Sequence, residues 1–91
     1  MQIADLKSLG PKSQEMLNAA GIHSVEQIHQ LGAVQVYFQV KRQQPNASLN
    51  LLWALESAIT GMPWQEVSRL HRTSLLLALN ELEQIAARTP K

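Results

Sequence analysis

The spacing of glycine and proline is the feature that most constrains how this chain can fold. Breaks fall at Gly10, Gly21, Gly32, Pro45 and Gly61, which leaves segments of helix length between them. Within these segments apolar residues recur every three or four positions, the period of an amphipathic helix. No segment alternates apolar and polar residues over the length of a strand. The sequence therefore predicts an all-α fold, a small bundle of about five helices.

Local signals place the ends of these helices. Pro11 suits a first helical position, where its missing N–H would be unpaired in any case. Ser24, with Gln27 three residues later, has the pattern of a capping box. The buried stripe expected for the helix that follows consists of Val25, Ile28 and Leu31. We expect helices over residues 11–20, 24–31, 33–44, 48–60 and 68–87, with a corner or single helical turn over residues 62–67.

The segment "SLNLLWALESAITG", residues 48–61, is apolar on nearly every side, as a buried helix is. We expect it to be the central helix, with Asn46 or Ser48 capping its start and Trp53 in the core. Trp64 is either a partner anchor or a ring packed over the central helix, and we favour packing.

The last helix is expected to begin at a cap formed by Ser68. Its apolar face consists of Leu75, Leu76, Leu79, Leu82 and Ile85.

Composition limits the classes of function. The 91 residues are the size of one domain, which we place at residues 1–91. Eight Lys and Arg against seven Asp and Glu leave a net charge of +1, so no global field draws the chain to nucleic acid or to an anionic membrane. With no cysteine, disulfides and thiolate chemistry are excluded. No stretch approaches the roughly 18 apolar residues of a membrane span, and we expect a soluble, cytoplasmic protein.

The residues that carry catalysis or metal binding are sparse. His23, His29 and His71 stand at none of the spacings that place two metal ligands on one helix face. Serine lacks the glycine context of a nucleophile elbow, and carboxylates near helix starts are explained by the helix dipole. We expect no enzyme, no catalytic residue, no cofactor and no metal site.

The turn Gly10-Pro11-Lys12-Ser13 is the first candidate contact site. Residues 9–31 look like a helix-hairpin-helix, in which a glycine turn presents backbone N–H groups to a DNA phosphate. Pro11 removes one such donor, although Lys12 supplies charge. The turn is therefore either a phosphate contact or a structural corner, and in the corner reading we expect Gly10 to be left-handed.

The segment "SRLHR", residues 68–72, is the second candidate. We expect Arg69 and Arg72 at the start of a helix, where cations gain nothing from the dipole. The segment is either a small basic patch for DNA or an acidic partner, or a solvated helix face.

Three stretches carry a family resemblance: "LKSLGPKSQEMLNAAGIHSVEQIHQLGA" at residues 6–33, "PNASLNLLWALESAITG" at 45–61 and "PWQEV" at 63–67. In this order they resemble the C-terminal domain of the TfoX/Sxy family of competence (DNA transformation) regulators. The resemblance implies a positive regulator of DNA-uptake genes that acts with the cyclic-AMP receptor protein, and it implies no catalytic residue.

Complete members of that family carry an N-terminal α/β domain, for which this chain has no room. The chain is then either a piece of a longer protein or a free-standing version of the domain. Two functions remain open: a protein-interaction module and a DNA-binding module that uses the Gly10–Ser13 turn. The expected protein partners are the family's N-terminal domain, RNA polymerase or the cyclic-AMP receptor protein. The oligomeric state stays open.

Overall fold

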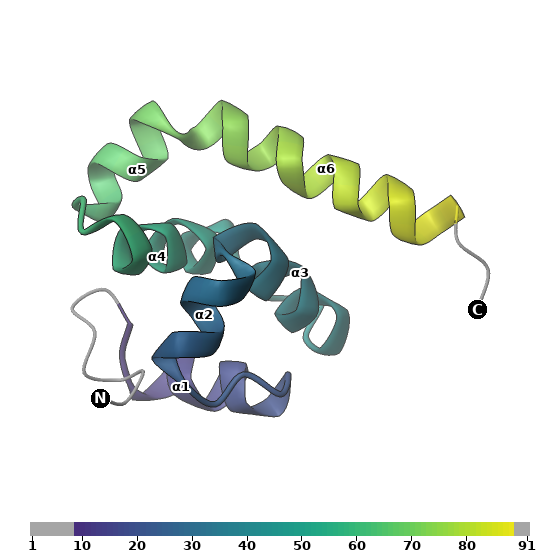
Figure 1. The fold of residues 1–91 in the computed structure, drawn as a ribbon, viewed down its shortest axis with the longest axis horizontal. Helices are drawn as coiled ribbons and strands as arrows, with labels where there is room; N and C mark the ends of the chain where they lie inside the picture. The colour runs from purple at the N-terminus through teal and green to yellow at the C-terminus, as the bar shows by residue number, and fades with distance from the viewer. Residues whose placement is uncertain (1–8, 89–91) are drawn as a thin grey trace.

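A computed structural model of the chain describes residues 9–88, and all regular structure in this part is helical (Figure 1). The helices, in chain order, are α1 (Pro11–Ala19), α2 (Val25–Leu31), α3 (Ala33–Gln43), α4 (Leu49–Thr60), α5 (Trp64–Leu70) and α6 (Arg72–Arg88). The predicted all-α fold is confirmed, and the described residues hold one helix more than the five expected.

Short-range chemistry sets several helix ends where the sequence predicted them. At the start of α2 the Gln27 backbone N–H donates to Ser24 Oγ, and the Ser24 backbone N–H donates to Gln27 Oε1, each over 3.2 Å. These two bonds form the predicted capping box. Gly61 ends α4 at φ 80° and ψ 0°, a left-handed conformation that glycine adopts at no steric cost.

The core lies between α3 and α4. The α4 residues Leu52 and Leu55 are fully buried, and Trp53 is 5% exposed, which confirms its predicted core position. Helix α3 packs against α1, α2, α4 and α6, whereas α4 packs against α2, α3 and α5. The helix predicted to be central therefore shares that role with α3, since α1 and α6 rest mainly on α3.

The segment after Gly61 differs from the expectation. Residues 64–70 form a complete helix, α5, and Ser68 lies inside it instead of capping the next one. The Ser68 hydroxyl donates to the carbonyl of Gln65 at 3.0 Å. The chain breaks only at His71, and α6 begins at Arg72. The expected cap is wrong because Val67 is buried, which extends the turn begun at Trp64 into a helix.

Trp64 opens α5 and is 47% exposed, so this ring is about half covered and is not part of the buried core. Two predicted apolar stripes are also buried only in part. In α2, Ile28 is fully buried but Leu31 is 39% exposed. In α6, Leu75 and Leu79 are buried, whereas Ile85 is 56% exposed because α6 runs on past the helices beneath it (Figure 1).

Candidate functional site

The Gly10–Ser13 turn leads directly into α1. Gly10 is the N-cap residue with φ −110° and ψ −172°, an extended conformation, so the expected left-handed geometry is wrong. The reason is its place before a helix, where an N-cap is extended. Its carbonyl accepts the Gln14 N–H at 3.0 Å. A Cβ added at Gly10 would meet no atom within 4 Å, so the backbone here does not require glycine.

The start of α1 offers few groups to an anion. The first N–H groups of a helix have no acceptor within it, and Pro11, at the first helical position as predicted, contributes none. The backbone N–H groups of Lys12 and Ser13 remain, together with the exposed Lys12 side chain. Two amides and one ammonium suit a loose phosphate contact as well as they suit a solvated corner.

A shallow groove of about 340 Å³ lies beside this turn. Its lining residues are Lys12, Glu15, Met16, Ala19, Gln43 and Gln44. The Gln44 side-chain amide donates to the carbonyl of Met16 at 3.2 Å and joins the end of α3 to α1. The Glu15 carboxylate shares the groove with the Lys12 ammonium, so the groove is not a purely cationic surface. Sequence reasoning missed this groove because residues 43 and 44 showed only a helix end.

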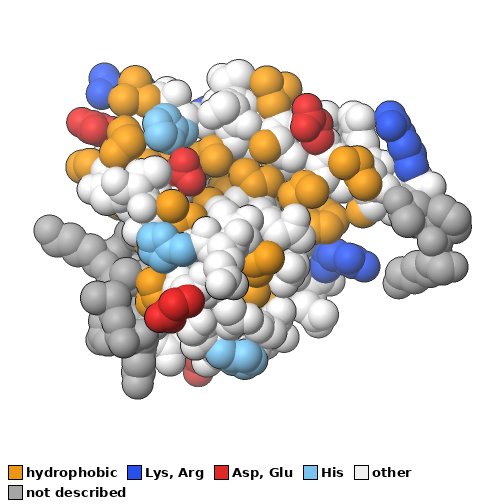
Figure 2. Space-filling view, in the orientation of Figure 1, with side chains coloured by type: hydrophobic (Ala, Val, Ile, Leu, Met, Phe, Trp, Pro, Cys, Tyr) orange, Lys and Arg blue, Asp and Glu red, His pale blue; other side chains and the backbone are white. Residues whose placement is uncertain are grey.

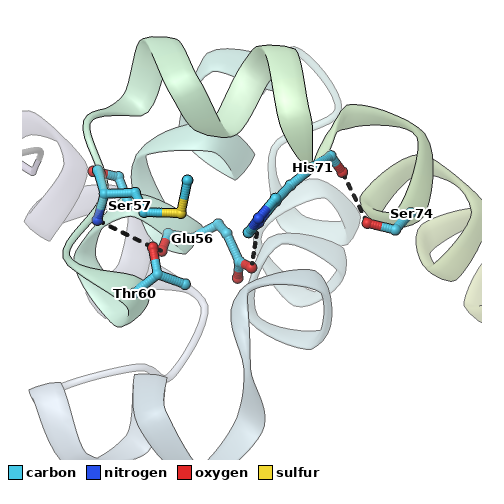
Figure 3. A network of polar contacts seen from close by, with 6 residues as sticks. Glu56, Ser57, Thr60, His71 and Ser74 are labelled. Carbon is cyan, nitrogen blue, oxygen red and sulfur yellow. Dashed lines mark hydrogen bonds and ion pairs between the residues drawn. The ribbon is translucent and has the colours of Figure 1, made fainter.

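The second candidate group lies at the junction of α5 and α6. Arg69 is in the last turn of α5, where a cation is favoured by the dipole, and this corrects the expected helix start. Arg72 is the first residue of α6, and both side chains are exposed. Between them, His71 Nδ1 lies 3.3 Å from Glu56 Oε2 of α4 (Figure 3). The basic segment therefore has a carboxylate against it, which sequence spacing did not reveal.

A network of short polar contacts holds the corner between α4 and α5 (Figure 3). The Thr60 hydroxyl donates to the Glu56 carbonyl at 2.8 Å and accepts the Met62 N–H at 3.3 Å. The Ser57 hydroxyl donates to the Met62 carbonyl. Two of these bonds tie the last turn of α4 to Met62, in the link that leads into α5.

The two candidate groups do not form one surface. Figure 1 places α1 and α5 on opposite sides of the body, so the turn with Gly10, Lys12 and Ser13 lies away from Arg69 and Arg72. On the face drawn in Figure 2, Lys and Arg appear as separate patches. The candidate residues thus form two separate basic spots, each with a carboxylate nearby, and further cations, Lys41 and Arg42, stand in the last turn of α3.

One titratable side chain in the core is tied to the loop before α4. Tyr37 is fully buried, and its hydroxyl donates to the Ala47 carbonyl at 2.9 Å. Burial, and secondly the Glu83 carboxylate, raises the pKa of Tyr37 above its ordinary value. Ser48 is the N-cap of α4, but its side chain makes no capping hydrogen bond. Ser48 thus occupies the expected N-cap position without the expected side-chain bond, and the Tyr37 hydroxyl binds the neighbouring Ala47 carbonyl.

Two features are absent from residues 9–88. No three His, Asp or Glu side chains in this part are grouped so that they could hold a metal ion. Among its helices, none combines the length and the apolar character that crossing a membrane requires.

Comparison with known proteins gives two matches. The family described as "TfoX C-terminal domain" matches residues 1–79. The DNA transformation protein TfoX of Haemophilus influenzae is 28% identical over 81 residues, which cover 89% of this chain and 37% of that protein. The chain thus spans little more than a third of the length of this relative. No solved structure matches the chain significantly.

Proposed function

The chain belongs to the TfoX C-terminal domain family, and on that premise we propose that it is the non-catalytic, protein-interaction domain of a regulator of natural competence. In this proposal it acts in the cytoplasm and helps to switch on DNA-uptake genes. The similarity to the Haemophilus influenzae DNA transformation protein supports the process. Its docking partner is a protein: the family's N-terminal domain, RNA polymerase or the cyclic-AMP receptor protein.

The arrangement of charge is the observation that carries the choice of a protein partner over DNA. Lys12 shares its groove with Glu15, and His71 pairs with Glu56 next to Arg69 and Arg72. DNA affinity depends on several phosphates being neutralised together. Two separated basic spots, each with a carboxylate, can neutralise few phosphates together. A net charge of +1 adds no long-range attraction to DNA.

The alternative, a DNA-binding module that works through the Gly10–Ser13 turn, is tested by salt dependence. Binding of duplex DNA is measured by fluorescence anisotropy at about 50 and 200 mM salt for the wild type and for Lys12→Ala. We expect weak or undetectable binding that Lys12→Ala leaves unchanged. Lys41→Ala is the matched control, because Lys41 lies in the last turn of α3 and outside the Gly10–Ser13 turn.

A different result would identify the turn as a phosphate contact. Tight binding whose slope of log affinity against log salt falls by about one unit in Lys12→Ala, and not in Lys41→Ala, would reject the proposal. In parallel, RNA polymerase and the cyclic-AMP receptor protein are titrated with the chain by calorimetry. Binding that persists at high salt is expected, because apolar docking is not driven by counterion release.

A further inference from the structure

The end of α6 projects beyond the rest of the molecule. We call residues 80–88 the α6 extension. Leu79, directly before it, is 5% exposed, and the family match ends at that residue. Within the extension, Leu82 is half-buried and Ile85 is 56% exposed. Figure 1 shows this part of the helix reaching past α3, and Figure 2 shows hydrophobic side chains that follow α6 toward its end.

The apolar side chains of this region share one face of the helix. Ala78, Leu82 and Ile85 stand at positions i, i+4 and i+7, the spacing with which one helix meets another in a coiled coil. The same spacing joins Leu75, Leu79 and Leu82, the stripe with which α6 meets the body. The extension thus continues the packing pattern of α6 from the half-buried Leu82 to Ile85, whose side chain is 56% exposed.

The charges beside this stripe select the direction of a second helix. Glu81 and Arg88 are seven residues apart on the same edge, about 10 Å along the axis, too far to pair with each other. Neither forms an ion pair within residues 9–88. Two antiparallel extensions centred between residues 84 and 85 bring Glu81 of each copy opposite Arg88 of the other. A parallel arrangement sets like charges against each other.

We propose that the α6 extension is a homodimer contact, in which a second copy of this chain docks antiparallel along the stripe formed by Leu82 and Ile85. The two-fold axis passes near Ile85, so each contact occurs twice. The antiparallel direction places the two bodies at opposite ends of the paired helices, clear of each other. The occupant is a second copy because the apolar stripe and the Glu81–Arg88 pair are complementary to themselves. This inference does not rest on the proposed function.

The contact is small, and interfaces below about 1,200 Å² are weak and transient. We therefore expect a dissociation constant between about 10 µM and 1 mM. Sedimentation velocity and equilibrium of the 91-residue chain over that range of concentration measure it directly. A chain that stays monomeric throughout would overturn the proposal and leave the stripe to another domain or protein.

An apolar-to-charged pair of variants locates the contact. Ile85→Asp is expected to raise the dissociation constant at least about tenfold, because it buries a charge at the two-fold axis. Leu77→Asp is the control: Leu77 is 60% exposed on the same helix but lies outside the stripe, and its dimerisation should match the wild type. Circular dichroism checks that both variants keep their helices. Equal dimerisation by Ile85→Asp and the wild type would reject the site.

A charge-reversal cycle tests the antiparallel register. Glu81→Arg alone and Arg88→Glu alone each set like charges opposite each other twice, and each should weaken the dimer about three- to tenfold. The double variant Glu81→Arg/Arg88→Glu restores both pairs and should return to the wild-type constant. Failure of the double variant to recover would exclude this register, and raising the salt concentration should shrink all three differences.

Discussion

The N-terminal hairpin (residues 9–32) and the C-terminal arm (residues 64–88) reach helical structure by different routes. In the hairpin, Gln27 alone makes four hydrogen bonds: its side chain accepts the N–H groups of His23 and Ser24 and donates to the Gly21 carbonyl, and its own N–H donates to Ser24 Oγ. The arm is held to the body by the side chains of Val67, Leu75 and Leu79 and by the contact from His71 to Glu56.

The difference shows in where large apolar side chains remain in water. Within residues 9–88, four of the five exposed large hydrophobics belong to the arm: Trp64, Leu70, Leu77 and Ile85. Short helices such as α2, with seven residues, need caps and burial to exist at all. Helix α6 has 17 residues and can continue past its packing partners. Among the described residues, the arm is therefore the part that exposes most of the large apolar side chains a partner could cover.

The largest expected contrast comes from two isoleucines. Ile28→Ala in the hairpin should lower the free energy of unfolding by about 2–5 kcal/mol, because its side chain is fully buried and leaves a cavity. Ile85→Ala in the arm should cost less than about 0.5 kcal/mol, because its side chain is 56% exposed. Urea unfolding at a concentration where the chain is monomeric measures both. Similar losses for the two variants would erase the distinction between hairpin and arm.

Tyr37 of α3 tests the loop before α4 through its hydroxyl bond and the arm through Glu83. Tyr37→Phe should lower the free energy of unfolding by about 1–3 kcal/mol. Ala47 is only 8% exposed, and its carbonyl would lose its hydrogen-bond donor. Since burial and Glu83 raise the pKa of Tyr37 in the folded state, stability is kept below the unfolded value of 10.0 and falls as pH rises through the folded pKa. Tyr37→Phe should remove that part of the decline, measured by urea unfolding between pH 9 and about pH 12.

The chain has one tyrosine, so the change of absorbance near 295 nm with pH reports the ionisation of this group, because the two tryptophans do not titrate. Glu83→Gln should lower the apparent pKa of Tyr37 toward its ordinary value, whereas Glu81→Gln is the matched control on the same helix. If neither change moves the tyrosine titration, Glu83 does not face α3 in solution and the end of the arm lies farther from the body.

The smallest contrast compares two serine N-caps. Ser24→Ala should cost about 0.5–2 kcal/mol, because it removes the acceptor for the Gln27 N–H. Ser48→Ala should cost a few tenths of a kcal/mol at most, because the Ser48 side chain makes no capping bond. Thermal unfolding followed by circular dichroism compares them. A larger loss for Ser48→Ala would show that local capping does not distinguish the hairpin from the rest.

Much of the hairpin was predictable because its determinants are close together in the sequence. The Ser24–Gln27 box, Pro11 at the first turn and burial of Ile28 each follow from residues within a few positions. The candidate contact residues could be named but not arranged. Nothing in the spacing shows that Arg69 lies at a helix end, that Glu56 meets His71, or that Lys12 shares a groove with Gln43 and Gln44.

The sequence by itself determined the all-helical class, the breaks at glycine and the identity of the core residue Trp53, because backbone sterics and apolar period act over one or two turns. Tertiary structure alone decided that α3 shares the centre with α4, that Trp64 and Leu31 stay exposed, and that α6 extends beyond the helices on which it packs. These outcomes depend on which apolar helix faces pack against each other. The sequence period alone does not choose between two faces that have the same spacing.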